Sequence, residues 1–279
     1  MRVGPATGMP TWTEQGELQF AIHSGQGEFP KIVLAPGNAR QIFSCVVEAF
    51  HLADKFQIPV IVLTDKYMNE SQWCVPKSVF SGDIVIDRGK MVHALDLGKE
   101  IFKRYDLSVP DGVSPRSIPG MKGGQFFANS YEHDEIGYVT EEPAVREKMA
   151  QKRLLKFQSI QKVVRPPDVY GDPKSEIALT CFGSTVGAVL DALESVQYIV
   201  SGKSVKLLHF TWCFPFPTES VTELLSDVKT IIDIEQNGTS QLASLIREYT
   251  GIACTHKITR FSGRPFTPKT VLEAVIQNL

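Results

Sequence analysis

The second part of the chain alternates short apolar runs with amphipathic segments, and this alternation constrains the fold more than any other feature. Each apolar run has the length of a strand and is followed by apolar residues at helical spacing. The expected elements are, in order, 176–182, 184–196, 205–210, 218–226, 228–235, 239–249, 253–260 and 268–277. Thr218 is expected to cap one helix and Gly251 to end the next. Because strand–helix–strand units form right-handed crossovers, the sequence predicts an α/β domain with a mainly parallel sheet.

The first part of the chain shows the same pattern only once. Apolar runs at 31–35 and 58–63 predict two buried strands, and apolar residues recur at helical spacing from 39 to 56. Two parallel strands do not form an independently stable sheet. We therefore expect a partial domain, whose missing strands come either from the following excursion or from a front half outside this chain.

The middle of the chain is irregular before it becomes regular again. Residues 69–130 carry many of the glycines and prolines, and so long an excursion indicates partner contact or a cover over a site. A charged amphipathic helix is expected at 141–164, and RPPDVYGDPKS at 165–175 is typical of a linker. The expected domains are therefore 1–164 and 176–279.

Composition excludes several classes of function. The chain has 279 residues and a formal net charge of −2, which gives no electrostatic basis for binding nucleic acid or an anionic membrane. Its apolar runs are far too short to span a bilayer, and no secretion signal pattern occurs. The five cysteines form no CxxC pair, so we expect reduced thiols in a cytoplasmic protein and no zinc or iron–sulfur site in this chain.

Motif searches yield little. The chain has no GxxxxGK[ST], HExxH or strand–GxGxxG–helix pattern. GMKGG at 120–124 has the glycines of a phosphate loop but no helix after it. His133 lies among Glu132, Asp134 and Glu135. A solvated polar turn is favoured there, and a metal site is the alternative.

Two polar stretches stand where parallel strands are expected to end. CFGST at 181–185 is typical of a capped helix start, although its backbone N–H groups are also suited to binding an anion. EQN at 235–237 is compatible with a ligand site or with an N-cap and an interface cluster. The residues alone leave both alternatives open.

The opening stretch MRVGPATGMPT has the residues of a binding loop. Arg2 carries a planar fork that matches a carboxylate, and Gly4 and Gly8 permit tight turns. Thr7 and Thr11 add hydroxyl groups. Composition alone favours a disordered tail over a binding loop.

A resemblance reverses that preference. RVGPATGMPTWTEQGEL resembles the RxGPSTGxPTxTEQxDL signature of the alpha subunits of 2-oxoacid:ferredoxin oxidoreductases, especially the 2-oxoglutarate type. GEFPKIVLAPGNAR, VLTDKYMNES and YEHDEIGYVTEEPAVREKMAQKRLLK continue the similarity in order. So do LTCFGSTVGAVLDAL, LHFTWCFPFP, EQNGTSQLASLIR and GRPFTP. The resemblance covers nearly every residue, and motifs this long in this order are highly specific.

The resemblance implies a thiamine-diphosphate-dependent enzyme. Such enzymes decarboxylate a 2-oxo acid, pass the acyl group to coenzyme A and transfer electrons singly to ferredoxin. It also implies a pyrimidine-binding domain followed by a transketolase C-terminal-like domain. A separate beta subunit is expected to hold the diphosphate, Mg²⁺ and the iron–sulfur cluster. The sequence agrees, because SGDIVID at 81–87 lacks the second glycine of the GDG motif that binds Mg²⁺ and diphosphate.

Two site residues follow from the resemblance. Arg2 matches the family arginine that pairs with the substrate carboxylate, and Thr11 matches a threonine that lines the same pocket. Ala6 stands where the family usually has serine, which removes one hydroxyl. No catalytic residue is carried over, so this chain is not expected to be active alone.

The family pattern also places a YPITPS-type segment and the cofactor-activating glutamate upstream of the loop. Neither is in this sequence. We therefore expect the product of a split or truncated gene, or a subunit whose first half is encoded separately. A gamma subunit or a separate N-terminal fragment is the expected further partner. Alternatives are a subunit of the 2-oxoacid dehydrogenase beta-chain or transketolase type, and a non-catalytic assembly module.

Overall fold

The computed structural model describes residues 1–80, 84–98, 100–200 and 204–279, which form two sheets. The first has the strand order β2-β1-β6, and the second has the order β3-β5-β4-β7-β8. The strands of the first are β2 (Val60–Val62), β1 (Ile32–Leu34) and β6 (Trp212–Phe214). The strands of the second are β3 (Asp168–Tyr170), β5 (Val205–Phe210), β4 (Ile177–Phe182), β7 (Thr230–Glu235) and β8 (His256–Thr259). Residues 81–83, the first three of the SGDIVID stretch, lie outside the described residues. The difference between this stretch and a GDG motif therefore stays an observation on the sequence alone.

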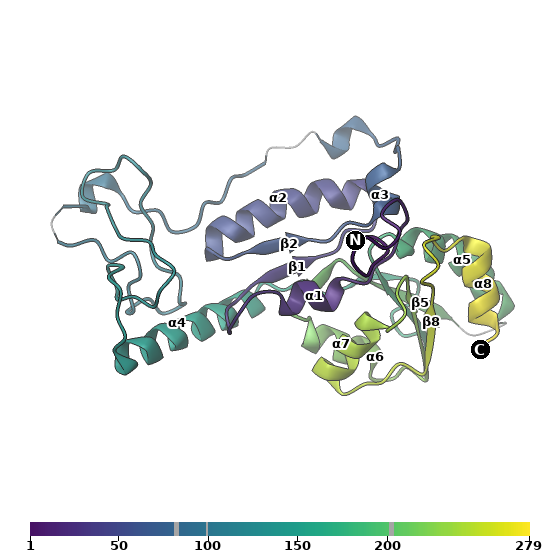
Figure 1. The fold of residues 1–279 in the computed structure, drawn as a ribbon. Coiled ribbons are helices and arrows are strands. Elements are labelled where there is room, and N and C mark those ends of the chain that lie inside the picture. Colours follow the sequence, from purple (N-terminus) through teal and green to yellow (C-terminus); the bar gives the residue numbers. More distant parts are fainter. Residues whose placement is uncertain (81–83, 99, 201–203) are drawn as a thin grey trace.

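Helices cover both faces of the second sheet (Figure 1). Alternate residues of β4 divide between two apolar clusters, since successive side chains of a strand point to opposite faces. Ile177 and Leu179 pack with α5 (Thr185–Ile199) and α8 (Pro268–Ile276). Ala178 and Phe182 pack with α6 (Thr218–Leu225) and α7 (Gln241–Thr250) on the other face. The β4–β5, β4–β7 and β7–β8 pairs are parallel, which confirms the predicted α/β class with a mainly parallel sheet.

The two predicted helix ends have different outcomes. Gly251 ends α7 in the left-handed region at φ 75° and donates to Arg247 O, so that prediction is confirmed. Thr218 is instead the first residue of α6, because Pro217 occupies the cap position. The Thr218 hydroxyl donates to the carbonyl of Phe216 and accepts nothing from the helix. The predicted N-cap is therefore wrong.

The first sheet is built from both parts of the chain. Helix α2 (Ala39–Phe56) has the predicted bounds, and Asn38 caps it by accepting from Gln41 N. Strand β1 is fully buried and pairs with β2 in parallel. On its other edge β1 pairs antiparallel with β6, where Val33 faces Phe214. The third strand thus comes from residues assigned by sequence to the second domain.

The segments between the sheets also carry structure. The range 165–175, expected to be a linker, contains β3, which pairs antiparallel with β5. The range 69–130 follows α3 (Lys66–Glu70) and includes short 3₁₀ turns at Lys77–Val79 and Ala94–Asp96. It runs past α2 toward the far end of α4 (Pro143–Gln161), as Figure 1 shows. No helix within the described parts of the chain is long and apolar enough to cross a membrane.

A buried acidic pair lies on β7. Asp233 and Glu235 are both 0% exposed and stand two residues apart on one strand. Thr180 Oγ1 donates to Asp233 Oδ1 at 2.8 Å, and Glu235 Oε1 accepts from Leu242 N at 2.8 Å. Burial, and then the charge of Glu235, raises the pKa of Asp233 well above its usual range. Asp233 therefore keeps its proton to a higher pH in the folded protein than in the unfolded chain.

The raised pKa of Asp233 predicts a pH-dependent stability. In the unfolded chain Asp233 loses its proton near pH 4, whereas the folded protein keeps it. Above about pH 4 the free energy of unfolding should therefore fall with rising pH relative to Asp233→Asn, by up to about 1.4 kcal/mol per pH unit. Urea unfolding at several pH values measures this difference. Asp191→Asn, at an exposed position, keeps Asp233, so its curve should run parallel to that of wild type. Parallel curves for wild type and Asp233→Asn would contradict the assignment.

Candidate functional site

The carboxyl ends of four parallel strands converge on one region. The turns after β1, β2, β4 and β7 bring Gly37, Asp65, Ser184 and Gln236 together. An added Cβ on Gly37 would lie 2.7 Å from Gly183 O, which shows how closely these turns approach. Ligands of open α/β sheets bind at this edge. The opening stretch of the chain crosses it.

Asp65 connects the elements that meet there. Its carboxylate is 0% exposed and accepts hydrogen bonds from three segments. Oδ1 accepts from Met68 N at 2.9 Å and caps α3. Oδ2 accepts from Gln15 Nε2 at 2.8 Å and from Ser184 N at 3.3 Å, at the start of α5. The anion at the CFGST helix start is thus a carboxylate of the protein itself, which favours the capped-start interpretation.

Gln15 extends this junction into the second sheet. It is 0% exposed, and its Oε1 accepts from Thr185 Oγ1 at 2.9 Å. Its backbone N–H donates to Gln236 O at 2.7 Å, and its carbonyl accepts from Asn237 Nδ2 at 3.2 Å. The EQN stretch is therefore part of a buried polar interface, which favours that alternative over a ligand site. We call Gln15, Asp65, Ser184, Thr185, Gln236 and Asn237 the polar junction.

The opening stretch forms a closed loop above the junction. Val3 N donates to Trp12 O at 3.2 Å, and Met9 N donates to Val3 O at 3.3 Å. Gly8 has φ 48°, and an added Cβ there would lie 2.3 Å from Val3 O, so only glycine fits. Residues 4–12 are exposed, while Thr13 is buried and its Oγ1 accepts from Tyr67 N. The stretch is an ordered loop, and the tail favoured by composition is wrong.

Arg2 lies inside this loop. Its Nη1 donates to Val3 O at 2.9 Å and to Thr7 O at 2.6 Å, and its Nη2 donates to Ala6 O at 2.7 Å. These contacts use three of the five N–H donors of a guanidinium. Within the described residues the remaining donors, on Nε and Nη2, have no partner. The loop therefore fixes the guanidinium and leaves part of its fork available.

Thr11 lies on the returning arm of the same loop and is exposed. Its hydroxyl makes no hydrogen bond to any described residue, and no contact joins it to Arg2. Trp12 next to it is covered by Arg264, whose guanidinium carbon lies 3.0 Å from the ring centroid. A residue from the second part of the chain thus packs against the opening loop.

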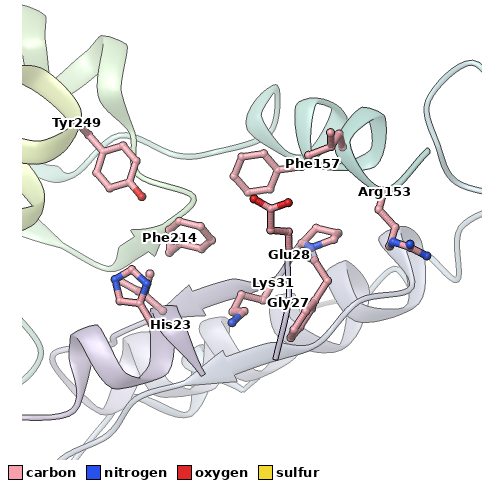
Figure 2. Close-up of a pocket in the computed structure, with 12 residues that line it drawn as sticks. His23, Gly27, Glu28, Lys31, Arg153, Phe157, Phe214 and Tyr249 are labelled. Atoms are coloured by element: carbon pink, nitrogen blue, oxygen red, sulfur yellow. The ribbon is translucent and has the colours of Figure 1, made fainter. Parts of the chain in front are cut away.

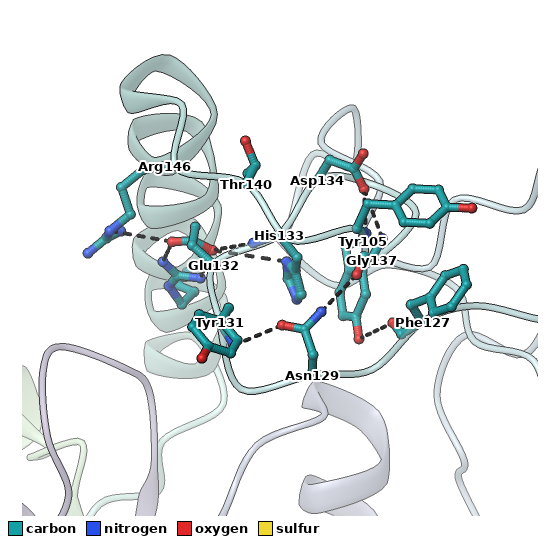
Figure 3. Close-up of polar contacts among 12 residues, drawn as sticks. Tyr105, Phe127, Asn129, Tyr131, Glu132, His133, Asp134, Gly137, Thr140 and Arg146 are labelled. Carbon is teal, nitrogen blue, oxygen red and sulfur yellow. Dashed lines mark hydrogen bonds and ion pairs between the residues drawn. The ribbon is translucent and has the colours of Figure 1, made fainter.

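The polar turn around His133 is half-buried by its own contacts (Figure 3). Glu132 accepts from Arg153 Nη2 at 2.7 Å, and the His133 ring stacks on Tyr105 with centroids 3.9 Å apart. Asp134 Oδ1 accepts from the backbone N–H groups of residues 136–138. The acidic groups are thus held by arginine and backbone, and the described residues contain no cluster of three metal-ligating side chains. The turn prediction stands.

Gln15 and Asp65 were not identified from the sequence as buried residues that hydrogen-bond several elements. Asp65 carried a usable signal, because an aspartate between a strand and a short helix is typical of an N-cap. Gln15 carried none, since its partners lie at 65, 185, 236 and 237.

Comparison with known families decides the relationship. Residues 1–152 match the family model "Pyruvate flavodoxin/ferredoxin oxidoreductase, thiamine diP-bdg", that is, thiamine-diphosphate-binding. Residues 175–271 match "Pyruvate:ferredoxin oxidoreductase core domain II". The chain belongs to the pyruvate flavodoxin/ferredoxin oxidoreductase family. The resemblance found in the sequence is thereby confirmed.

Individual members of this family align over the whole chain. The alpha subunit of 2-oxoacid:ferredoxin oxidoreductase 2 from Aeropyrum pernix is 39% identical over 99% of this chain and 42% of its own length. The 2-oxoglutarate synthase subunit KorA of Archaeoglobus fulgidus is 26% identical over 99% of this chain and 69% of its own length. The chain therefore spans about two fifths of the Aeropyrum subunit.

A solved member of the family has the same fold. The 2-oxoglutarate:ferredoxin oxidoreductase from Magnetococcus marinus superposes with a TM-score of 0.86 at 32% identity. The match covers 99% of this chain and 47% of that one, whose structure contains bound 2-oxoglutarate, coenzyme A and succinyl-CoA.

Replacing Asp65 should remove the hydrogen bonds that hold the polar junction together and destabilise the protein. Asp65→Ala leaves three buried donors without an acceptor, at about 1–3 kcal/mol for a single unsatisfied group. We expect the free energy of unfolding to fall by more than about 3 kcal/mol, measured by urea denaturation. Asp65→Asn keeps the acceptor for Met68 N but turns an amide toward Gln15 Nε2 and Ser184 N, so it should also destabilise, by less. A loss below 1 kcal/mol for Asp65→Ala would contradict the role of the carboxylate.

Proposed function

We propose that this chain is part of the alpha subunit of a thiamine-diphosphate-dependent 2-oxoacid:ferredoxin oxidoreductase. The complex would convert a 2-oxo acid to its acyl-CoA and pass the electrons to ferredoxin. We propose 2-oxoglutarate as the preferred substrate. The observation that carries the proposal is the closed loop at 3–12, which holds Arg2 above the carboxyl edge of the strands. The KorA relative and the ligands of the Magnetococcus enzyme support the choice of 2-oxoglutarate.

Arg2 would bind the carboxylate of the 2-oxo acid. Backbone carbonyls of Val3, Ala6 and Thr7 already hold the guanidinium, so little side-chain freedom is lost when a ligand binds. The donors on Nε and Nη2 provide a side of the fork that matches two carboxylate oxygens. Thr11, on the exposed arm of the loop, would supply a hydroxyl to the same pocket. The loop thus binds and orients the substrate, and the reaction requires groups from elsewhere.

The cofactors would be shared with or held by a partner. Thiamine diphosphate supplies the electron sink for decarboxylation when it is bound. The described residues offer no acidic cluster for Mg²⁺ and diphosphate. Among the described residues no cysteine belongs to a group of three side chains that could hold a metal ion. We assign Mg²⁺, the diphosphate and the cluster to a beta subunit.

The long excursion is the surface that we propose for subunit contact. Val85 is 77% exposed, Ile86 73%, Leu95 86% and Ile101 75%, and a subunit contact would bury these apolar side chains. Besides the beta subunit, a gamma subunit is a candidate partner. All five cysteines are free, in accord with the proposed cytoplasmic location.

The activity is tested on the complex that co-purifies with this chain. We expect 2-oxoglutarate to reduce ferredoxin in a reaction that requires coenzyme A and added thiamine diphosphate. Reduction of NAD through lipoamide would indicate the dehydrogenase type. Absence of thiamine-dependent oxidation of any 2-oxo acid would indicate an assembly module.

Changing Arg2 tests the assigned site within that complex. One charge-assisted carboxylate contact is worth about 1.5–3 kcal/mol, so Arg2→Ala should raise the KM for the 2-oxo acid by about tenfold or more. Arg2→Lys keeps the charge but not the fork, and should also raise it. The KM for coenzyme A should stay unchanged in both variants. Arg247→Ala, on the exposed side of α7, is the matched control, and an unchanged KM in Arg2→Ala would remove Arg2 from the site.

A further inference from the structure

A cavity of about 340 Å³ opens at the opposite end of β1 from the Arg2 loop. Helices α1 (Leu18–His23), α4 and α7, strand β6 and the segment 27–31 all contribute to its wall. Figure 2 shows side chains from these elements pointing toward a common space. Its volume lies within the usual range of small-molecule sites. Nothing in the proposed reaction uses it.

Aromatic rings form much of the wall. Phe157 of α4 and Phe214 of β6 lie with their ring centroids 5.8 Å apart. Tyr249 of α7 stacks on Phe216, with centroids 5.2 Å apart, and so is fixed in place. Ile22 and Leu154 complete this apolar surface. Such a wall accepts a flat or branched apolar body by van der Waals contact.

Lys31 contributes a positive charge to the lining of this cavity. The residue is only 6% exposed, and its Nζ donates to the carbonyl of Ser24 and lies 4.6 Å from the ring centroid of Phe29. Among the described residues no carboxylate lies within ion-pair distance of it. Desolvation alone lowers its pKa, with no opposing effect of a nearby anion. The ammonium therefore has a carbonyl and an aromatic ring as partners, but no anion among the described residues.

Of the other ionisable groups that line the cavity, Arg153 and His23 are not anions, and Arg153 is itself paired with Glu132 at 2.7 Å. Glu28 is exposed, and Figure 2 shows its carboxylate and the Lys31 ammonium pointing in different directions. His23 is exposed at the rim. A negative group from outside is therefore what the cavity is suited to take.

We propose that this cavity binds a monocarboxylate with an aromatic or branched apolar body. The carboxylate would pair with Lys31, and the body would pack on Phe157 and Phe214. The site is separate from the Arg2 loop, because Lys31 precedes β1 whereas the loop stands at the carboxyl ends of the strands. This inference does not rest on the proposed enzymatic function.

Calorimetric titration of the full chain with 3-phenylpropionate tests the proposal. We expect saturable binding of one equivalent. The uncharged isostere 3-phenylpropanamide should bind at least about tenfold more weakly, because it lacks the charge-assisted contact. Lys31→Gln should weaken binding of the acid to a similar extent, while Lys174→Gln, at an exposed position, should leave it unchanged. Glu28→Gln should tighten it, since a like charge is removed.

The variants also separate this site from the proposed substrate site. Arg2→Ala should leave 3-phenylpropionate binding unchanged, whatever its effect on the KM for a 2-oxo acid. Three results would overturn the proposal: no saturable binding, equal affinity for the acid and the amide, or loss of binding in Arg2→Ala. The comparison of acid and amide uses the wild-type protein, so it decides the matter even if Lys31→Gln does not fold.

Discussion

The arrangement of this protein depends on the buried carboxylate of Asp65. It receives hydrogen bonds from the loop that follows the opening stretch, from α3 and from the first turn of α5. Donors from three segments satisfy one buried anion, and removal of the carboxylate would leave all three buried donors without this acceptor. Because Gln15 is one of these donors, the position of the loop that holds Arg2 is fixed by contacts with both sheets.

The two sheets are also joined because a strand from the second part of the sequence belongs to the first sheet. Strand β6 leaves the second part of the sequence to pair with β1, and Phe157 of α4 packs against Phe214 of that strand. The same short strand β1 therefore has two different surroundings. The polar junction and the Arg2 loop lie at its carboxyl end, and the aromatic cavity with Lys31 lies at its amino end. Strand β1 thus lies between the proposed substrate site at one of its ends and a separate cavity at the other.

The sequence predicts the regular elements well and the short ones poorly. Strand 205–210 and helix 39–56 were predicted with their observed bounds, since burial and periodicity are local signals. Strands β3 and β6 have three residues each, and their pairing depends on partners far along the chain. Phe50 belongs to the apolar stripe that predicts α2, yet it is 72% exposed, so periodicity indicated the helix but not which face is covered here. Arg2 and Thr11 came from the resemblance, whereas Gln15 depended on contacts that no local pattern contains.

The most direct test of this account is a structure of the assembled complex with 2-oxoglutarate bound. We expect a carboxylate of the 2-oxo acid to accept from Nε and Nη2 of Arg2 at about 2.7–2.9 Å, with the carbonyls of Val3, Ala6 and Thr7 still bound to the same guanidinium. Substrate bound elsewhere, with no carboxylate in contact with Arg2, would contradict the assignment of the opening loop as the substrate site.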